Sequence, residues 1–249
     1  MKIAKRLFLV AVLILAAAVI GFVIWGSLAL QPMPEALNAL NSTAQVSERS
    51  SPWIEFTPTA KKPTAGFILY PGARVDPRAY APQAQAIAEK GYLVVIPAMP
   101  INFAIFGGNK AAEIIAAHPE VKHWVLGGHS LGGVMAAAYS KQHPEQIEGL
   151  VFLASYPTNS DDLTQSSLKV TSIYASQDGL ATKAKIDASR PLLPANTDWV
   201  EISGGNHAQF GWYGLQPGDN PATISHQAQQ DQIVAAVVKL LLSLDKNPS

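Results

Sequence analysis

The feature that most constrains the fold of this chain is a glycine-rich segment, residues 127–133, between a short apolar run and a helical pattern. It contains Gly128-x-Ser130-x-Gly132, the spacing of a nucleophile elbow, in which a strand turns sharply into a helix. On such a turn the serine adopts a strained backbone conformation and its hydroxyl points outward. The residues two before and two after the serine approach each other closely, and only glycine, which has no side chain, fits at both positions without a clash. The segment therefore predicts a strand, a reactive Ser130 and a helix, in that order.

A glycine-rich turn between strand and helix also suits phosphate binding, which is the main alternative. Gly127 and Gly132 have the spacing of a P-loop, but Gly133 stands where a P-loop has lysine. The G-x-G-x-x-G fingerprint of dinucleotide sites does not occur at this turn. Residues 123–127 resemble a short buried strand and residues 131–143 a helix, which favours the nucleophile elbow. We therefore expect no nucleotide cofactor, and the chemistry requires no metal.

The N-terminal part of the chain carries an uncharged apolar run, residues 7–30, long enough to cross a bilayer at about 1.5 Å rise per residue. Lys2, Lys5 and Arg6 precede this run, and by the positive-inside rule they keep the N-terminus in the cytoplasm. A cleaved signal peptide is the alternative, which would make the protein secreted, but its apolar region is normally shorter. We expect residues 1–30 to be an uncleaved transmembrane signal anchor, with the rest of the chain on the extracytoplasmic side.

The remainder of the chain is expected to form a linker and one domain. Residues 31–51 contain prolines and a polar run with weak periodicity, which indicates a linker. Residues 52–249 suit a single domain. That domain is large enough to bury a core without disulfides, which the absence of cysteine excludes.

The charge of the chain excludes some classes of partner. Lysine and arginine balance aspartate and glutamate at 18 each, and without the three basic residues near the N-terminus the balance is −3. This charge gives no support for nucleic acid or anionic lipid as a partner.

Beyond the linker, apolar strand-like runs alternate with helical patterns. Strands are expected at 66–70, 92–97, 123–127, 149–154, 169–175 and 199–202, and helices at 79–90, 109–118, 131–143 and 224–244. This alternation predicts an α/β fold, with a mostly parallel sheet covered by helices on both faces. Ligand sites in such sheets form beyond the carboxyl ends of the strands. Polar residues that directly follow strands are therefore the candidates for chemistry.

A serine hydroxyl needs a base, and the base needs an acid that orients it. His207 is the candidate base because it lies in a glycine-rich loop directly after the last expected strand. The five other histidines lie at helix ends, at a strand start, within the elbow or in a polar segment that we expect to be exposed: His118, His143, His123, His129 and His226. Asp178 is the candidate acid, in an Asp-Gly turn after the strand at 169–175. Its rivals are Asp161, Asp162 and Asp187.

From about residue 64 to residue 244 the chain resembles the α/β-hydrolase superfamily, in which the triad follows the order serine, acid, histidine. The resemblance rests on four segments: Tyr70-Pro-Gly-Ala73, Gly128-His-Ser-Leu-Gly132, Ser176-Gln-Asp178 and Gly205-Asn-His207. The compact layout resembles the dienelactone-hydrolase-like group, because the short connection after the strand at 149–154 leaves no room for a cap domain. Dienelactone hydrolases proper use a cysteine nucleophile, which this chain lacks. The resemblance therefore implies a serine esterase.

Two backbone N–H groups are expected to receive the negative charge that builds on the substrate oxygen. Leu131 is one candidate donor, since it directly follows the nucleophile at a helix N-terminus. By resemblance to relatives, Ala73 in the loop after the strand at 66–70 is the other.

Two apolar loops, 99–106 and 210–215, follow strand ends and are candidates for a rim that accepts an acyl chain or touches the bilayer. Ordinary core packing is the alternative interpretation. The candidate substrate-binding residues are four aromatic residues and the histidine beside the nucleophile: Phe103, Phe106, Phe210, Trp212 and His129.

The sequence thus predicts a membrane-anchored serine hydrolase that cleaves carboxylic (acyl) esters through an acyl-enzyme on Ser130. Its expected partners are a small-molecule acyl ester or lipid substrate and, through the N-terminal helix, a membrane. Two alternatives stay open. One is a catalytically silent binding protein with the same fold, and the other is an acyltransferase in which an alcohol replaces water.

Overall fold

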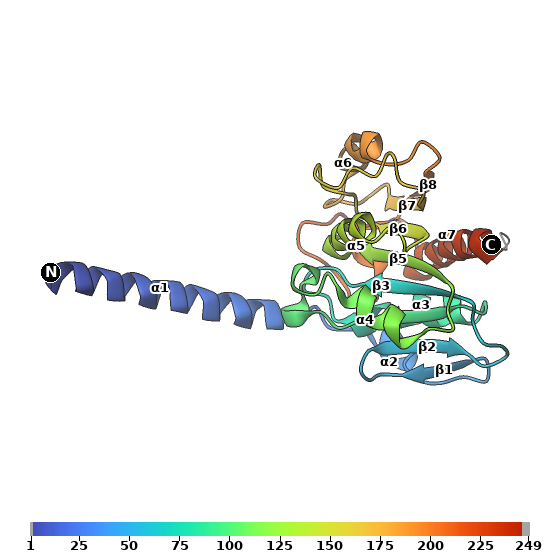
Figure 1. The fold of residues 1–249 in the computed structure, drawn as a ribbon, viewed down its shortest axis with the longest axis horizontal. Coiled ribbons are helices and arrows are strands. Elements are labelled where there is room, and N and C mark those ends of the chain that lie inside the picture. The colour runs from blue at the N-terminus through green and yellow to red at the C-terminus, as the bar shows by residue number, and fades with distance from the viewer. Residues whose placement is uncertain (1, 246–249) are drawn as a thin grey trace.

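The computed structural model describes residues 2–245, so residue 1 of the expected anchor and residues 246–249 of the expected domain lie outside the described residues. Within that range a long N-terminal helix projects from a body built around one eight-stranded sheet (Figure 1). The strands are β1 (Val46–Arg49), β2 (Ile54–Pro58), β3 (Ala65–Tyr70), β4 (Leu93–Ile96), β5 (His123–His129), β6 (Gly149–Leu153), β7 (Lys169–Ala175) and β8 (Asp198–Ile202).

The strand order in the sheet is β1-β2-β4-β3-β5-β6-β7-β8. All neighbours from β4 to β8 pair in parallel, whereas β2 pairs antiparallel with both β1 and β4. The predicted mostly parallel sheet is therefore confirmed. The chain moves outward in one direction from β3 to β4 and in the other from β5 to β8. The carboxyl ends of β3 and β5 thus flank the point where the strand order reverses, which is where ligands bind in open sheets of this kind.

Helices cover both faces of the sheet, as the sequence predicts. The α-helices of the body are α2 (Pro34–Asn38), α3 (Ala81–Ala88), α4 (Lys110–Ala117), α5 (Leu131–Gln142), α6 (Lys183–Ser189) and α7 (His226–Asp245), with short 3-10 turns η1 (Pro77–Tyr80), η2 (Pro100–Asn102), η3 (Ala104–Phe106), η4 (Arg190–Leu192) and η5 (Ala208–Phe210).

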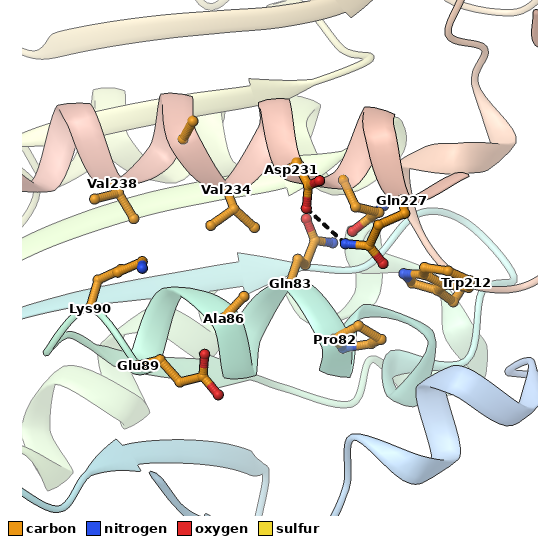
Figure 2. Close-up of a pocket in the computed structure, with 12 residues that line it drawn as sticks. Pro82, Gln83, Ala86, Glu89, Lys90, Trp212, Gln227, Asp231, Val234 and Val238 are labelled. Carbon is orange, nitrogen blue, oxygen red and sulfur yellow. Dashed lines mark hydrogen bonds between the residues drawn. The ribbon is translucent and has the colours of Figure 1, made fainter. Parts of the chain in front are cut away.

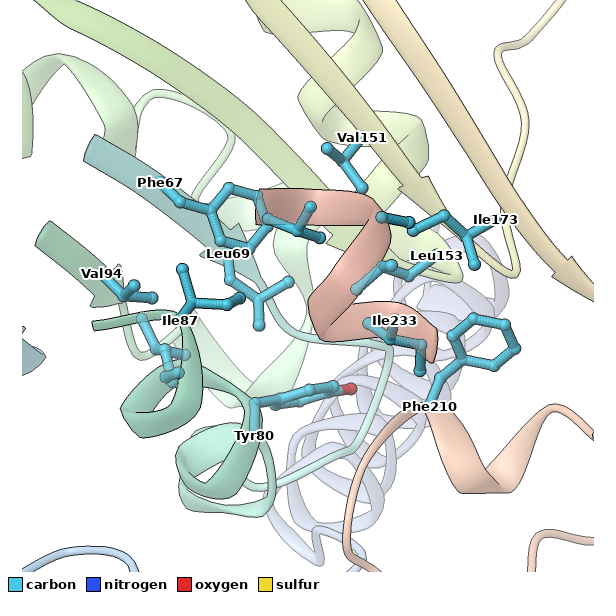
Figure 3. Packing of buried hydrophobic residues seen from close by; sticks show 14 of the residues in the cluster. Phe67, Leu69, Tyr80, Ile87, Val94, Val151, Leu153, Ile173, Phe210 and Ile233 are labelled. Carbon is cyan, nitrogen blue, oxygen red and sulfur yellow. The ribbon is translucent and has the colours of Figure 1, made fainter. Parts of the chain in front are cut away.

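Side chains that alternate along the strands build a core on each face. Phe67 and Leu69 of β3 pack with α3 and α7, as Figure 3 shows around Ile87 and Ile233. Ile68, between them in sequence, belongs to the opposite core with α4 and α5. The central strands are therefore buried on both sides, which explains their uninterrupted apolar sequences.

The segment expected as a linker, residues 31–51, differs from that expectation. It contributes α2 and β1 to the body, and the side chains of Ala36 and Val46 are fully buried. β1 has four residues and buries only Val46 completely, so it is too short to show an apolar period in sequence. Folded structure thus begins well before residue 52.

The N-terminal helix α1 (Lys2–Ser27) is, among the described residues, the one helix long and apolar enough by length and composition to cross a membrane. Its apolar side chains stand exposed along most of its length. Only its last turns touch the body, at the loops that follow β3 and β4 (Figure 1).

Candidate active site

The elbow expected around Ser130 forms between β5 and α5. Ser130 has φ 51° and ψ −121°, a strained conformation for a residue other than glycine. A Cβ on Gly128 would collide with the backbone of Gly132, and one on Gly133 would come within 2.6 Å of Ser155. The glycines therefore permit the close crossing of strand and helix that holds Ser130 at the carboxyl edge of the sheet.

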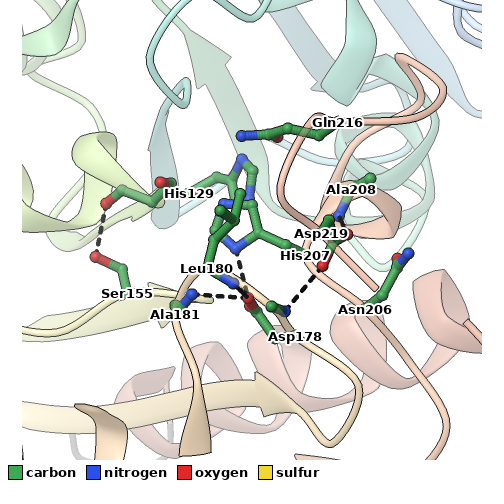
Figure 4. Close-up of polar contacts among 12 residues, drawn as sticks. His129, Ser155, Asp178, Leu180, Ala181, Asn206, His207, Ala208, Gln216 and Asp219 are labelled. Carbon is green, nitrogen blue, oxygen red and sulfur yellow. Dashed lines mark hydrogen bonds and ion pairs between the residues drawn. The ribbon is translucent and has the colours of Figure 1, made fainter. Parts of the chain in front are cut away.

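Asp178 and His207, which are far apart in the sequence, form a buried pair at the same edge (Figure 4). His207 Nδ1 lies 2.8 Å from Asp178 Oδ2. The other carboxylate oxygen, Oδ1, accepts hydrogen bonds from the backbone N–H groups of Leu180 and Ala181, both at 2.7 Å. An ionised carboxylate accepts from all three donors, so it orients the imidazole with Nδ1 protonated and Nε2 available as a base.

A pocket of about 260 Å³ opens at this edge, and both Ser130 and His207 line it. Leu131, Ala154 and Tyr156 are among its other walls. The Nε2 atom of His207 is buried and has no hydrogen-bond partner among the described residues. The structure thus brings Ser130 to the same pocket as the Asp178–His207 pair without a direct hydrogen bond between serine and histidine. In enzymes without substrate such contacts are often long and tighten in the complex.

The two candidate oxyanion donors lie on either side of the strand-order reversal. Leu131 starts α5 and lines the pocket, and its N–H has no acceptor among the described residues. Ala73 lies in the loop after β3, between Gly72, whose N–H is bonded to Tyr80 Oη, and Arg74, whose N–H is bonded to a backbone carbonyl. The N–H of Ala73 likewise has no acceptor among the described residues, although Ala73 is not part of the pocket wall.

Two residues that the sequence did not suggest support this edge. Ser155 lies two residues after the end of β6 and donates from its Oγ to the backbone oxygen of Ser130 at 2.6 Å (Figure 4). The carboxylate of Asp219 accepts hydrogen bonds from the N–H of Gly179, which follows Asp178, and from the N–H of Ala208, which follows His207. A polar residue soon after a strand is a usable signal for Ser155, whereas nothing local in the sequence marks Asp219.

His129, expected to contact substrate, lies instead beside His207 and away from the pocket. It is 1% exposed, and its ring centroid is 4.5 Å from that of His207. Its Nδ1 lies 2.8 Å from Tyr80 Oη, which in turn accepts the N–H of Gly72. Burial and the neighbouring His207 place the pKa of His129 well below its usual value, so the ring stays neutral. His129 therefore belongs to the layer that supports the site, not to the pocket wall.

Three of the four aromatic candidates are also outside the pocket for reasons of packing. Phe210 is fully buried in the core with α7 (Figure 3). Its ring stacks on that of His129. Phe103 and its neighbour Phe106 pack against the last turns of α1, with Phe103 at 5.6 Å from the ring of Phe22. Phe103 and Phe106 therefore do not line the Ser130 pocket as an acyl-binding rim. Contact of this loop with a bilayer, the other part of the expectation, stays a prediction.

Trp212, the fourth aromatic candidate, lines a different cavity of about 330 Å³ between α3 and α7 (Figure 2). Its ring stacks on His226 at 3.8 Å. His226 is therefore half-buried, contrary to our expectation, and burial lowers its pKa to about 4. The Ser130 pocket and this cavity share no lining residue.

The fold and the elbow now allow the class of protein to be stated. The sequence model of the alpha/beta hydrolase family matches residues 66–231, which is more than half of the chain. This protein belongs to the alpha/beta hydrolase family. No curated protein sequence matches the chain.

Solved structures share the fold at low sequence identity. Est1E from Butyrivibrio proteoclasticus has a TM-score of 0.59 at 11% identity, with 82% of this chain and 100% of that chain covered. A predicted CIB-like hydrolase from Thermoplasma acidophilum has 0.56 at 15%, covering 80% and 98%. The thermophilic esterase Est2 from Thermogutta terrifontis has 0.54 at 13%, covering 81% and 92%. At these identities the similarity establishes the fold.

Proposed function

We propose that this protein is a membrane-anchored serine esterase in which Ser130 is the nucleophile, His207 the general base and Asp178 the acid that orients it. The observation that carries the proposal is the buried contact of 2.8 Å between His207 Nδ1 and Asp178 Oδ2. His207 also lines the same pocket as Ser130, whose backbone is strained. Membership of the alpha/beta hydrolase family and the fold shared with two esterases agree with this chemistry.

The reaction would proceed through an acyl-enzyme. His207 Nε2 takes the proton of the Ser130 hydroxyl as the Oγ attacks the ester carbonyl. The carbonyl oxygen gains a negative charge, which the N–H groups of Leu131 and Ala73 receive. The alcohol leaves with the proton from His207, and a water molecule, activated by the same histidine, releases the acid from Ser130.

The anchor belongs to the proposal as well. α1 has the length and apolar composition of a membrane span, and basic residues precede its apolar run. We therefore place the hydrolase body on the extracytoplasmic side. The boundary between anchor and body would lie near residue 30, where Leu30 first pairs with Val75 of the body.

Turnover of p-nitrophenyl acetate by the purified full chain tests the proposal. Ser130→Ala and His207→Ala should each lower kcat by at least about a thousandfold, because the residues act as a unit. Ser166→Ala, which removes a hydroxyl away from this pocket, is the matched control and should keep wild-type activity. Unchanged turnover in either triad variant, with the fold intact by circular dichroism, would remove that residue from the mechanism. A folded wild-type protein that turns over no acyl ester would point to a binding role.

A further inference from the structure

The end of α1 is fixed to the body without a flexible tether. The guanidinium of Arg74 donates to the backbone oxygens of Trp25 and Leu28, at 3.1 Å from Nε and 2.8 Å from Nη2. Asn102 Nδ2 donates to the backbone oxygen of Gly26 at 3.0 Å. These bonds reach inside the last turn of the helix. The body is therefore held against the end of α1 in one orientation.

The edge that is held there is the one that carries Ser130. Arg74 lies in the loop after β3, next to the candidate oxyanion donor Ala73. β3 and β5 run in parallel with Tyr70 opposite Gly128, so the loop after β3 and the elbow leave the sheet in the same direction. α1 projects from this carboxyl edge and away from the body (Figure 1). A membrane that contains α1 would thus lie on the side of the sheet where the pocket opens.

Aromatic contacts set the depth of the loop after β4 relative to the helix. The ring of Phe22 lies 5.6 Å from that of Phe103 and 6.4 Å from that of Phe106. Phe22 precedes Ser27, the last residue of α1, by five residues. At about 1.5 Å per residue, Phe22 lies about 7 Å back along the helix axis. The ring of Phe103 also lies 5.7 Å from that of Trp25, two residues before Ser27, so the loop packs beside about 3–7 Å of the helix end. Interfacial segments bury their apolar faces about 5–10 Å into the boundary between headgroups and acyl chains, so this depth matches such a segment.

Exposed apolar side chains occur in two loops that follow strands at this edge. Ile105, between the two phenylalanines, is 57% exposed. Leu215 is 89% exposed and lies in the loop that leads to Asp219, whose carboxylate bonds the backbone beside the triad pair. By contrast, the exposed Leu242 lies near the C-terminal end of α7, where Asp245 meets Thr64 just before β3. It therefore marks the opposite edge of the sheet.

We propose that the carboxyl edge of the sheet docks on the lipid bilayer, with Ile105, Phe106 and Leu215 in the interface, and that Ser130 takes a long-chain acyl ester from the bilayer itself. The substrate class rests on the proposed esterase function, and the docking rests on the proposed membrane anchor together with the contacts that hold the end of α1 to the body. A lipid ester in the bilayer would then move only a short distance, from the interface into a pocket that faces the membrane. A water-soluble ester would enter the same pocket from the side.

The absence of cysteine makes the docking directly measurable. Ile105→Cys, Leu215→Cys and Leu242→Cys in the full chain each take one environment-sensitive NBD fluorophore and are reconstituted into phosphatidylcholine vesicles. A nitroxide-labelled phosphatidylcholine in the vesicles should quench the probes at positions 105 and 215 at least severalfold more than the probe at 242. Leu15→Cys, in the middle of α1, reports that the helix is inserted.

The outcomes of the quenching experiment distinguish failure of the docking from failure of the anchor and from self-association of the chain. Probes at 105 and 215 that behave like the probe at 242, while the probe at 15 is quenched, would overturn the docking. An unquenched probe at 15 would overturn the anchor and the docking together. Protection of positions 105 and 215 that depends on protein concentration and not on nitroxide lipid would show that a second copy of the chain covers this edge, which also overturns the proposal.

Activity separates failure of the substrate class from failure of the proposed function. The double variant Ile105→Ser/Leu215→Ser should lower hydrolysis of a long-chain ester in vesicles about tenfold and leave p-nitrophenyl acetate turnover unchanged. Leu242→Ser should change neither. Equal rates on the vesicle ester in all three proteins would overturn the substrate class. If wild type hydrolyses neither ester, the proposed esterase function fails, and the quenching result still decides the docking.

Discussion

At the scale of single residues, Asp178 differs from the other described aspartates because a histidine and two backbone N–H groups converge on its buried carboxylate. Its two oxygens face one imidazole N–H and two backbone N–H groups, and its side chain is fully buried. Asp162, its rival after the preceding strand, is exposed. The carboxylate of Asp178 can therefore hold His207 in one tautomer, a role that an exposed aspartate cannot fill.

Asp178→Asn should lower kcat for p-nitrophenyl acetate by about 10³–10⁴-fold, with KM within a few-fold of wild type. An amide nitrogen facing His207 Nδ1 would favour the tautomer that has its proton on Nε2, which cannot accept the serine proton. Steady-state kinetics on the purified full chain measures this effect. Asp162→Asn should behave as wild type, and activity of Asp178→Asn within tenfold of wild type would exclude Asp178 as the orienting acid.

A second residue-scale feature is the chain of hydrogen bonds beneath the pocket. Gly72 N–H donates to Tyr80 Oη at 2.9 Å, and among the described residues the tyrosine hydroxyl has one other partner, His129 Nδ1, at 2.8 Å. Burial raises the pKa of Tyr80, so the hydroxyl stays protonated and donates to the neutral His129. Tyr80 thereby fixes the loop that presents Ala73.

Tyr80→Phe should lower kcat about tenfold, because it leaves the buried Gly72 N–H without an acceptor, a loss of about 1–3 kcal/mol that the loop can relieve by moving. KM should change little, since Tyr80 does not line the pocket. Tyr139→Phe removes a similar partly buried hydroxyl, bonded to Gln146, far from this loop and serves as the control. An equal effect of both substitutions on kcat would refute the positioning role of Tyr80.

At the scale of elements, the contact between β2 and the end of α4 joins the antiparallel edge of the sheet to its parallel part. His118 Nε2, at the C-cap of α4, lies 3.2 Å from Glu55 Oε2 on β2. Burial alone would raise the pKa of Glu55, but the contact with His118 and the hydrogen bonds from Arg49 and Trp53 lower it to about 2. The contact with Glu55 raises the pKa of His118 above its usual 6.5.

This pair predicts a pH-dependent stability. The raised pKa of His118 means that its contribution is complete below pH 6.5 and is lost as the pH rises through the folded-state value. The lowered pKa of Glu55 means that its contribution is complete above pH 4.5 and is lost as the pH falls towards 2. His118→Gln should therefore lower the free energy of unfolding by on the order of 1 kcal/mol between pH 5 and 6 and by less at pH 9. Urea unfolding at each pH measures the difference, and a pH-independent difference would contradict this assignment.

The sequence predicts well the helices with a long apolar pattern and the strands that are buried on both faces of the sheet. β7 and the start of α5 occur where expected, because central parallel strands are apolar throughout and the elbow glycines mark the helix start. β1 and β2 were not expected. An edge strand such as β1 buries only part of one face, so its four residues show no clear alternation of apolar and polar side chains. Which strands are neighbours depends on contacts between distant segments, so the sheet order could not be derived from local patterns.

For the candidate site, too, some residues could be predicted from the sequence and others could not. Positions directly after strands identified Ser130, Asp178 and His207 as candidates, and the structure brings all three to one edge. The aromatic candidates do not line the Ser130 pocket, because an apolar residue after a strand can turn back into the core, as Phe210 does, or pack on a distant helix, as Phe103 does on α1. Sequence alone does not distinguish these directions.

At the scale of the whole molecule, three features coincide at the carboxyl edge of the sheet. The strand order reverses there between β3 and β5, the elbow and the triad pair lie there, and the last turn of α1 is bonded there. The segment expected as a linker packs onto the body, with Met33 N–H bonded to the backbone oxygen of Trp212 at 2.8 Å. The proposed catalytic edge and the proposed anchor are thus directly joined in the structure.

The most direct measurement of the central claim is the site of covalent labelling by a fluorophosphonate, which reacts with serines activated by a neighbouring base. After incubation of the full chain with the probe, peptide mass spectrometry should find the phosphonyl group on Ser130. Ser130→Ala should remain unlabelled, and His207→Ala should label at least about a hundredfold more slowly. Labelling of Ser155, which also lines the pocket, or no labelling of folded wild-type protein would contradict the assignment of Ser130 as the nucleophile.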